Sequence, residues 1–142
     1  MRAAFALALL LAGPAAAHVE VPPGAFHAGG IAVIEFTFHH GCDGAATTAL
    51  QVRLPASLSE IAPQPKAGWQ VTQEGQVLSW SGGEIAPDAP ASFRLQARVA
   101  RDAPARILLP VLQICGAQVQ HWISPNPQAS HPAPALVVLP AP

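Results

Sequence analysis

Hydrophobic and polar residues alternate along much of the chain, and this alternation predicts β-strands. The clearest example runs from Phe93 to Val99, where Phe, Leu, Ala and Val are separated by Arg, Gln and Arg. Successive side chains of a strand point to opposite faces, so a period of two is typical of a strand with one buried face. Residues 32–38 and 50–54 show the same pattern. Each of the three segments is therefore expected to be a half-buried strand.

Other segments extend the strand prediction. A hairpin is expected for residues 69–73 and 76–81, because Glu74-Gly75 stands between them and such a pair favours a tight turn. Residues 107–115 are more continuously apolar, which favours one central strand. The remaining predicted strands are residues 119–123 and 136–139.

Helix signals are nearly absent from the sequence. The 16 prolines and 11 glycines interrupt the chain every few residues and leave no room for long helices. Several short strands with turns between them predict an all-β fold, a two-sheet antiparallel sandwich. Residues 125–134 are rich in proline, and we expect this tail to lie extended along the surface.

The N-terminus has the features of a secretory signal peptide, residues 1–17. A basic start precedes an apolar run at residues 3–12, and three alanines end at Ala17, which is typical of a cleavage site. An apolar run of about 10 residues is too short for a membrane span, which needs about 20. The alternative is a buried N-terminal helix, which the proline after the apolar run disfavours. Cleavage before His18 would leave residues 18–142 as a single periplasmic or secreted domain.

Composition and motifs narrow the classes of partner and activity. The chain carries 7 basic and 8 acidic residues, so we expect neither nucleic acid nor an anionic membrane surface as a partner. After residue 17, no stretch has the length of a membrane span. The sequence holds no glycine-rich phosphate loop and no HExxH, CxxC or GxSxG motif, which would mark common enzyme classes. We therefore expect a protein that is not an enzyme.

The two cysteines, Cys42 and Cys115, allow two interpretations. A disulfide is expected in an oxidising compartment, and closing so long a loop would stabilise the fold by roughly 3–4 kcal/mol. The alternative is a pair of thiolate ligands for copper. The chain has no methionine-rich segment of the kind that soft Cu(I) sites favour, so the composition favours the disulfide.

Cleavage before His18 would create a metal-chelating group. A terminal histidine offers two nitrogens, the α-amine and the ring Nδ1, and both suit Cu(II) in its tetragonal geometry. An ordinary terminal amine has a pKa of about 8, so it loses its proton at modest cost when a metal binds. The alternative is that His18 is only the residue at which the peptidase cuts.

The densest group of candidate ligands is the sequence His-His-Gly-Cys-Asp at residues 39–43. It follows a predicted strand, so it is expected at a turn. Imidazole nitrogens of His40 and carboxylate oxygens of Asp43 are both metal donors, and a disulfide at Cys42 would anchor the loop, as a metal site needs. The alternative is that both histidines face solvent.

Trp122 is the third candidate, and it stands on a predicted strand between polar neighbours. One interpretation is a half-exposed sheet residue, and the other is a ring that shields a copper site from solvent. His121 points to the opposite face of that strand. We expect His121 to be a hydrogen-bonded histidine of the sandwich rather than a ligand.

Several short motifs along the chain after residue 16 match one known family. The matching blocks are AHVEV at 17–21, HGCDG at 40–44, TTA at 47–49, LP at 54–55, PQPKAGW at 63–69, WSGG at 80–83, LPVLQIC at 109–115, HWI at 121–123 and HPAP at 131–134. In this order they resemble the YcnI-like domain, DUF1775, which is found in bacterial copper-homeostasis loci.

The resemblance implies an immunoglobulin- or cupredoxin-like β-sandwich that binds Cu(II) through a histidine brace. In that family the brace is built on the N-terminal histidine, with an acidic side chain and a tryptophan nearby. His18 matches the brace position and Trp122 the tryptophan. The acidic ligand does not transfer, because a His-Gly-Cys-Asp loop stands where other members carry a glutamate. His40 is the first candidate for the replacement ligand, and Asp43 is the second.

The expected function is therefore that of a periplasmic Cu(II)-binding protein that stores, buffers or delivers copper. Its partners would be the copper ion and other periplasmic or membrane copper-handling proteins. Two alternatives stay open. One is a copper-dependent oxidative enzyme that uses the same brace, although the chain is small and has no tyrosine. The other is a metal-independent interaction module.

Overall fold

The computed structural model describes residues 18–142, and the regular structure in this part of the chain is β-strand. The predicted signal peptide, residues 1–17, lies outside the described residues. The strands are β1 (Phe26–His27), β2 (Ile31–Phe38), β3 (Thr47–Arg53), β4 (Leu58–Pro63), β5 (Gln70–Glu74), β6 (Val77–Ile85), β7 (Ala91–Val99), β8 (Arg106–Leu108), β9 (Val111–Cys115), β10 (Gln118–Trp122) and β11 (Ala135–Leu139). Among the described residues, no helix is long and apolar enough to cross a membrane.

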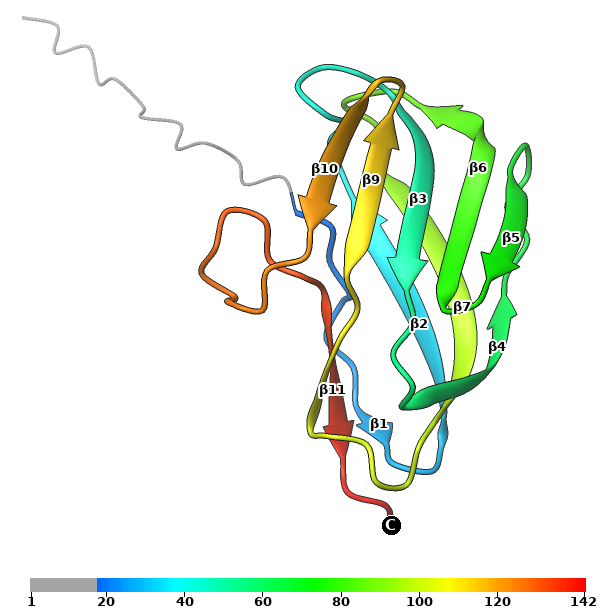
Figure 1. Cartoon of the computed structure of the whole chain (residues 1–142), viewed down its shortest axis with the longest axis vertical. Coiled ribbons are helices and arrows are strands. Elements are labelled where there is room, and N and C mark those ends of the chain that lie inside the picture. The colour runs from blue at the N-terminus through cyan, green and yellow to red at the C-terminus, as the bar shows by residue number, and fades with distance from the viewer. Residues whose placement is uncertain (1–17) are drawn as a thin grey trace, which may run out of the picture.

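Two antiparallel sheets face each other and enclose the core (Figure 1). The larger sheet has the strand order β10-β9-β3-β6-β5, and the smaller one has the order β2-β7-β4. A third small sheet, β1-β11-β8, lies at the end of the molecule near the C-terminus, and in it β1 runs parallel to β11. The predicted all-β sandwich is confirmed, with this third sheet as an addition.

The predicted alternation places every second side chain in the core. In β7 every second residue from Ala91 to Val99 is buried, and in β2 the same holds from Ala32 to Phe38. The predicted hairpin around Glu74-Gly75 is also present as β5 and β6. The large side chains at the centre of the core include Trp80, Phe36, Phe93, Ile34 and Leu50.

The apolar segment at residues 107–115 forms two strands, whereas one was predicted. β8 pairs with β11 in the small sheet, and β9 pairs with β3 and β10 in the large sheet. Pro110 lies between them, and a proline has no N–H to donate to a sheet. The chain therefore changes sheets at this point, and the hydrophobic run continues because both strands line the core.

Residues 125–134 do not form the extended surface tail that the prolines suggested. The backbone turns at Asn126, whose carbonyl accepts a hydrogen bond from the N–H of Ala129 at 3.1 Å. The chain then returns to Ser124, where the Ser124 N–H donates to the His131 carbonyl at 3.1 Å and the Ala133 N–H donates to the Ser124 carbonyl at 2.8 Å. The segment is a closed loop whose two ends are joined, and it leads directly into β11.

Trp69 lies against Gly83, and this contact predicts an effect on stability. The indole meets Phe93 edge-on, with ring centroids 5.0 Å apart, and a Cβ atom on Gly83 would overlap the indole. We expect Gly83→Ala to lower the free energy of unfolding by about 1–3 kcal/mol, because overpacking has that cost. Urea unfolding measures the change. In a Trp69→Leu background the same substitution should cost less, and an equal cost in both backgrounds would contradict the contact as the cause.

Candidate metal centre

The first described residues are held against the end of β2. The backbones of Glu20 and Thr37 exchange two hydrogen bonds, at 2.9 and 2.8 Å, and Val19 is buried in the core. These contacts fix the position of His18, whose ring lies 5.7 Å from the ring of Trp122 at an interplanar angle of 61°. His18 and Trp122, two of the predicted site residues, are therefore neighbours although they lie far apart in the sequence.

Trp122 is buried, with 4% of its surface exposed, so of its two interpretations the half-exposed sheet residue is wrong. Its side chain points inward at the end of β10, and its indole N–H donates to Oε1 of Gln113 at 3.2 Å. His121, the preceding residue, is exposed on the other face of β10, so it is not a histidine enclosed by the sandwich. Strand alternation produces this difference, because neighbouring side chains take opposite faces.

Gln113 lies at the centre of a buried hydrogen-bond network that sequence reasoning missed. Its side chain is 1% exposed. Besides accepting from Trp122, it donates from Nε2 to the carbonyl of His40 at 2.7 Å and to Oγ1 of Thr47 at 2.9 Å. The available signal was a glutamine at an inward position of an apolar strand, since a buried amide must be hydrogen-bonded.

The loop after β2 is tied down at several points. Cys42 and Cys115 form a disulfide with Cα atoms 5.8 Å apart, which confirms the predicted pairing and excludes these cysteines as thiolate ligands. The Gly41 N–H donates to the Pro87 carbonyl at 2.7 Å, and a Cβ atom at Gly41 would overlap the carbonyl of Ala45. The loop is therefore a fixed structure, although both of its histidines are exposed.

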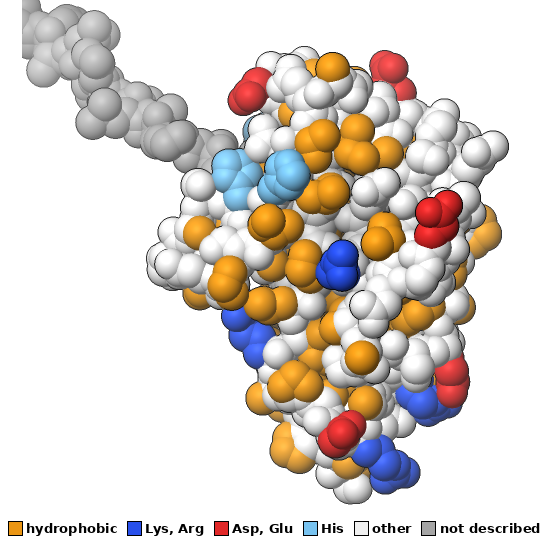
Figure 2. Space-filling view, in the orientation of Figure 1, with side chains coloured by type: hydrophobic (Ala, Val, Ile, Leu, Met, Phe, Trp, Pro, Cys, Tyr) orange, Lys and Arg blue, Asp and Glu red, His pale blue; other side chains and the backbone are white. Residues whose placement is uncertain are grey.

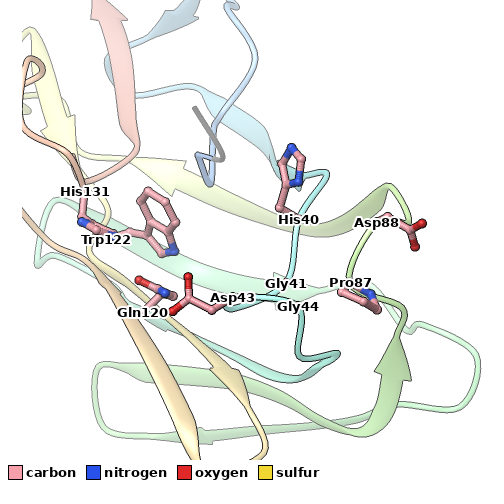
Figure 3. A pocket seen from close by; sticks show the side chains of 9 residues that line it. All are labelled: His40, Gly41, Asp43, Gly44, Pro87, Asp88, Gln120, Trp122 and His131. Carbon is pink, nitrogen blue, oxygen red and sulfur yellow. The ribbon is translucent and has the colours of Figure 1, made fainter. Parts of the chain in front are cut away.

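A cavity of about 550 Å³ separates this loop from the end of β10. The side chains that line it include His40, Asp43, Asp88, Gln120, Trp122 and His131. In Figure 3 the carboxylate of Asp43 points toward Gln120 and Trp122, whereas the ring of His40 points away from Asp43. The two candidates for the second ligand thus lie on the same cavity but reach different parts of it.

Figure 2 shows histidine side chains close together beside hydrophobic ones at one side of the molecule.

His131 is a cavity residue that sequence reasoning did not select. Its ring lies 4.7 Å from the ring of Trp122 at an interplanar angle of 45°, and its carbonyl accepts a hydrogen bond from the Ser124 N–H, which holds its backbone in place. A single histidine in a proline-rich segment carries no periodic signal, because the loop closure that brings it to Trp122 depends on tertiary contacts.

The donor atoms around Trp122 are of the kinds that suit Cu(II), namely imidazole nitrogen and carboxylate oxygen. Among the described residues, no three His, Cys, Asp or Glu side chains are placed so that they could together hold a metal ion. A site built on His18 also uses the α-amine, which is part of a peptide bond with Ala17 in the full-length chain. The kinds of donor therefore suit Cu(II), but His18 lines a different pocket from His40, Asp43 and His131, and the α-amine donor would exist only after cleavage.

Comparisons with known proteins agree with the fold. An uncharacterized protein from Nocardia farcinica with an immunoglobulin-like fold has a TM-score of 0.71 and 23% identity, covering 86% of this chain and 96% of that chain. The seventh ScaB type I cohesin from Pseudobacteroides cellulosolvens has a TM-score of 0.53 and 13% identity, covering 89% and 94%. At these identities the likeness shows the sandwich fold alone. No curated protein matches the chain.

One family model matches the sequence itself. It is described as a domain of unknown function, DUF1775, and it matches residues 18–78 and 70–138. The two ranges together span nearly all of the described residues, and they begin at His18. The protein therefore belongs to the DUF1775 family.

Proposed function

We propose that the chain, once processed to begin at His18, binds Cu(II) in the periplasm and stores, buffers or delivers it. One observation carries the proposal. His18 directly follows the predicted signal peptide, and its ring is held 5.7 Å from the ring of the buried Trp122. The internal disulfide fits an extracytoplasmic protein, because such bonds persist in oxidising compartments.

The proposed brace follows from the chemistry of a terminal histidine. The freed α-amine and the imidazole of His18 would chelate the ion from one residue, and amine and imidazole nitrogens suit Cu(II). Trp122 would cover one side of the ion with an apolar ring, which lowers access of water to the site. Because Val19 and the Glu20 backbone are anchored, the terminus would not need to reorganise when the metal binds.

A second protein ligand would come from the loop after β2. His40 is the first candidate, since imidazole suits Cu(II) better than carboxylate does, and Asp43 is the second. His131 joins them as a third donor on the same cavity.

A Cu(II) titration of the processed chain, residues 18–142, tests the proposal. We expect saturation at one Cu(II) per chain and an electron paramagnetic resonance spectrum of a tetragonal site with nitrogen hyperfine structure. Quenching of tryptophan emission should follow the same curve, because the ion would lie beside Trp122. Absence of saturable binding, or a spectrum without nitrogen ligands, would contradict the proposal.

Substitutions in the cavity should separate the candidate ligands. We expect His40→Ala to weaken Cu(II) binding by more than about 100-fold and Asp43→Asn to weaken it by about 10- to 100-fold, since the loss of a ligand exceeds the loss of a supporting partner. His121→Ala is the matched control, because His121 is exposed on the outer face of β10, and it should bind like the unsubstituted chain. A larger loss for Asp43→Asn than for His40→Ala would assign the ligand to Asp43 and contradict His40.

A further inference from the structure

Gln113 joins the two sides of the cavity through one buried amide. Its Oε1 accepts from the indole N–H of Trp122 at 3.2 Å, and its Nε2 donates to the His40 carbonyl at 2.7 Å and to Thr47 Oγ1 at 2.9 Å. An indole N–H can only donate and a carbonyl can only accept. The partners therefore determine which end of the amide is oxygen and which is nitrogen.

The position of Gln113 in the sheet explains why it can reach both sides. β9 lies between β10 and β3, and Val111, Gln113 and Cys115 are its inward-facing residues. Gln113 thus contacts the end of β10, the loop after β2 and the start of β3, which are far apart in sequence. The next inward residue, Cys115, binds the same loop through the disulfide. Gln113 and Cys115, on one face of β9, therefore hold the loop after β2 at His40 and at Cys42.

The hydrogen bond also decides how Trp122 meets its neighbours. Because the indole N–H is used by Gln113, this N–H is not available to His18, to a metal ligand or to an anion in the cavity. The rings of His18 and Trp122 meet edge-on with their centroids 5.7 Å apart. Trp122 therefore presents ring carbons to the imidazole. The ring would act on the metal site by covering it, not by donating a hydrogen bond.

We propose that Gln113 is a positioning residue of the copper site, one that holds the ring of Trp122 against His18 and the backbone of His40 at the cavity edge. This inference rests on the proposed function. It assigns a role to a residue that touches neither the ion nor its ligand side chains. Outer residues that orient metal ligands typically affect metal affinity by about 10- to 100-fold.

The test compares two substitutions at Gln113 with a matched control. Gln113→Met is close in shape and removes all three hydrogen bonds, whereas Gln113→Glu keeps an acceptor for Trp122 and loses the amide donor to His40. Thr47→Val is the control, because it removes the bond to Gln113 and the contact with Cys115 Sγ, neither of which involves Trp122 or His40. The indole N–H resonance of Trp122 is recorded without metal, and Cu(II) affinity and the paramagnetic resonance spectrum are recorded with it.

We expect Gln113→Met to shift the Trp122 indole resonance, to weaken Cu(II) binding by about 10- to 100-fold and to change the copper spectrum. Gln113→Glu should retain the indole hydrogen bond yet still weaken Cu(II) binding, and this variant carries the test if Gln113→Met does not fold. Thr47→Val should lower stability but leave the Trp122 resonance, the Cu(II) affinity and the copper spectrum unchanged. Wild-type affinity and spectrum in every Gln113 variant that folds would overturn the inference. Failure of the unsubstituted chain to bind Cu(II) would instead overturn the proposed function. The Trp122 indole resonance is recorded without metal, so it reports the Gln113 hydrogen bond in either case.

Discussion

One alanine added ahead of His18 in the processed chain is expected to weaken Cu(II) binding by more than about 100-fold, because even outer-shell changes at metal sites cost about 10- to 100-fold. The added residue converts the α-amine into a peptide nitrogen, which is no longer a basic donor. The imidazole remains, yet it can no longer close a chelate ring with its own terminus. Competition against a Cu(II) chelator of known affinity measures the change.

The same extension should leave the fold intact. His18 lies at the start of the described residues, and the anchoring contacts are made by Val19 and by the backbone of Glu20 with Thr37. A chain with one alanine added after Pro142 is the matched control, because the C-terminal residue is exposed. Both extended chains should unfold like the processed chain, and only the N-terminal one should lose copper affinity. Equal tight binding by all three would contradict the brace.

The strands of the sandwich could be predicted because burial follows a period of two. In β2 and β7 one face is covered by the core and the other is open to solvent, so hydrophobic and polar residues must alternate. Where both faces of a segment are partly covered, the alternation is lost. This is the case across residues 107–115, where continuous hydrophobicity concealed the change of sheet at Pro110.

Two strands escaped prediction for different physical reasons. β1 has only 2 residues and pairs with β11, so its own sequence carries no repeat. β4 has an irregularity between Ser59 and Ala62, and a bulge shifts the alternation by one residue. In both cases the pairing partner, which lies far away in the sequence, decides the structure.

The candidate site was predictable only in part. Short-range chemistry pointed to His18 and to the loop with His40, and the disulfide that anchors this loop is confirmed. The placement of His131 on Trp122 required the closed loop before β11, which no local pattern encodes. In the sequence Gln113 is only a polar residue within an apolar strand, because its three hydrogen-bond partners are brought together by the fold.

Removing the disulfide should have the largest effect on stability. In a Cys42→Ala, Cys115→Ala chain we expect the free energy of unfolding to fall by about 4 kcal/mol, because the bond restricts a long loop in the unfolded chain. The two cysteines are 73 residues apart in the sequence. Small domains are typically stable by about 5–15 kcal/mol, so the variant should fold at 25 °C with a much reduced margin. Urea unfolding measures the difference.

The unsubstituted chain after reduction is the control, and it should unfold close to the double variant. A loss below about 1 kcal/mol would contradict the chain-entropy account. Copper affinity of the folded variant then tests how far the disulfide positions the loop. The Gly41 and Gln113 hydrogen bonds still hold the loop, so the affinity should fall less than it does on N-terminal extension. If stability falls as expected while copper affinity stays unchanged, the disulfide does not position the second ligand, and the Gly41 and Gln113 hydrogen bonds suffice to hold the loop.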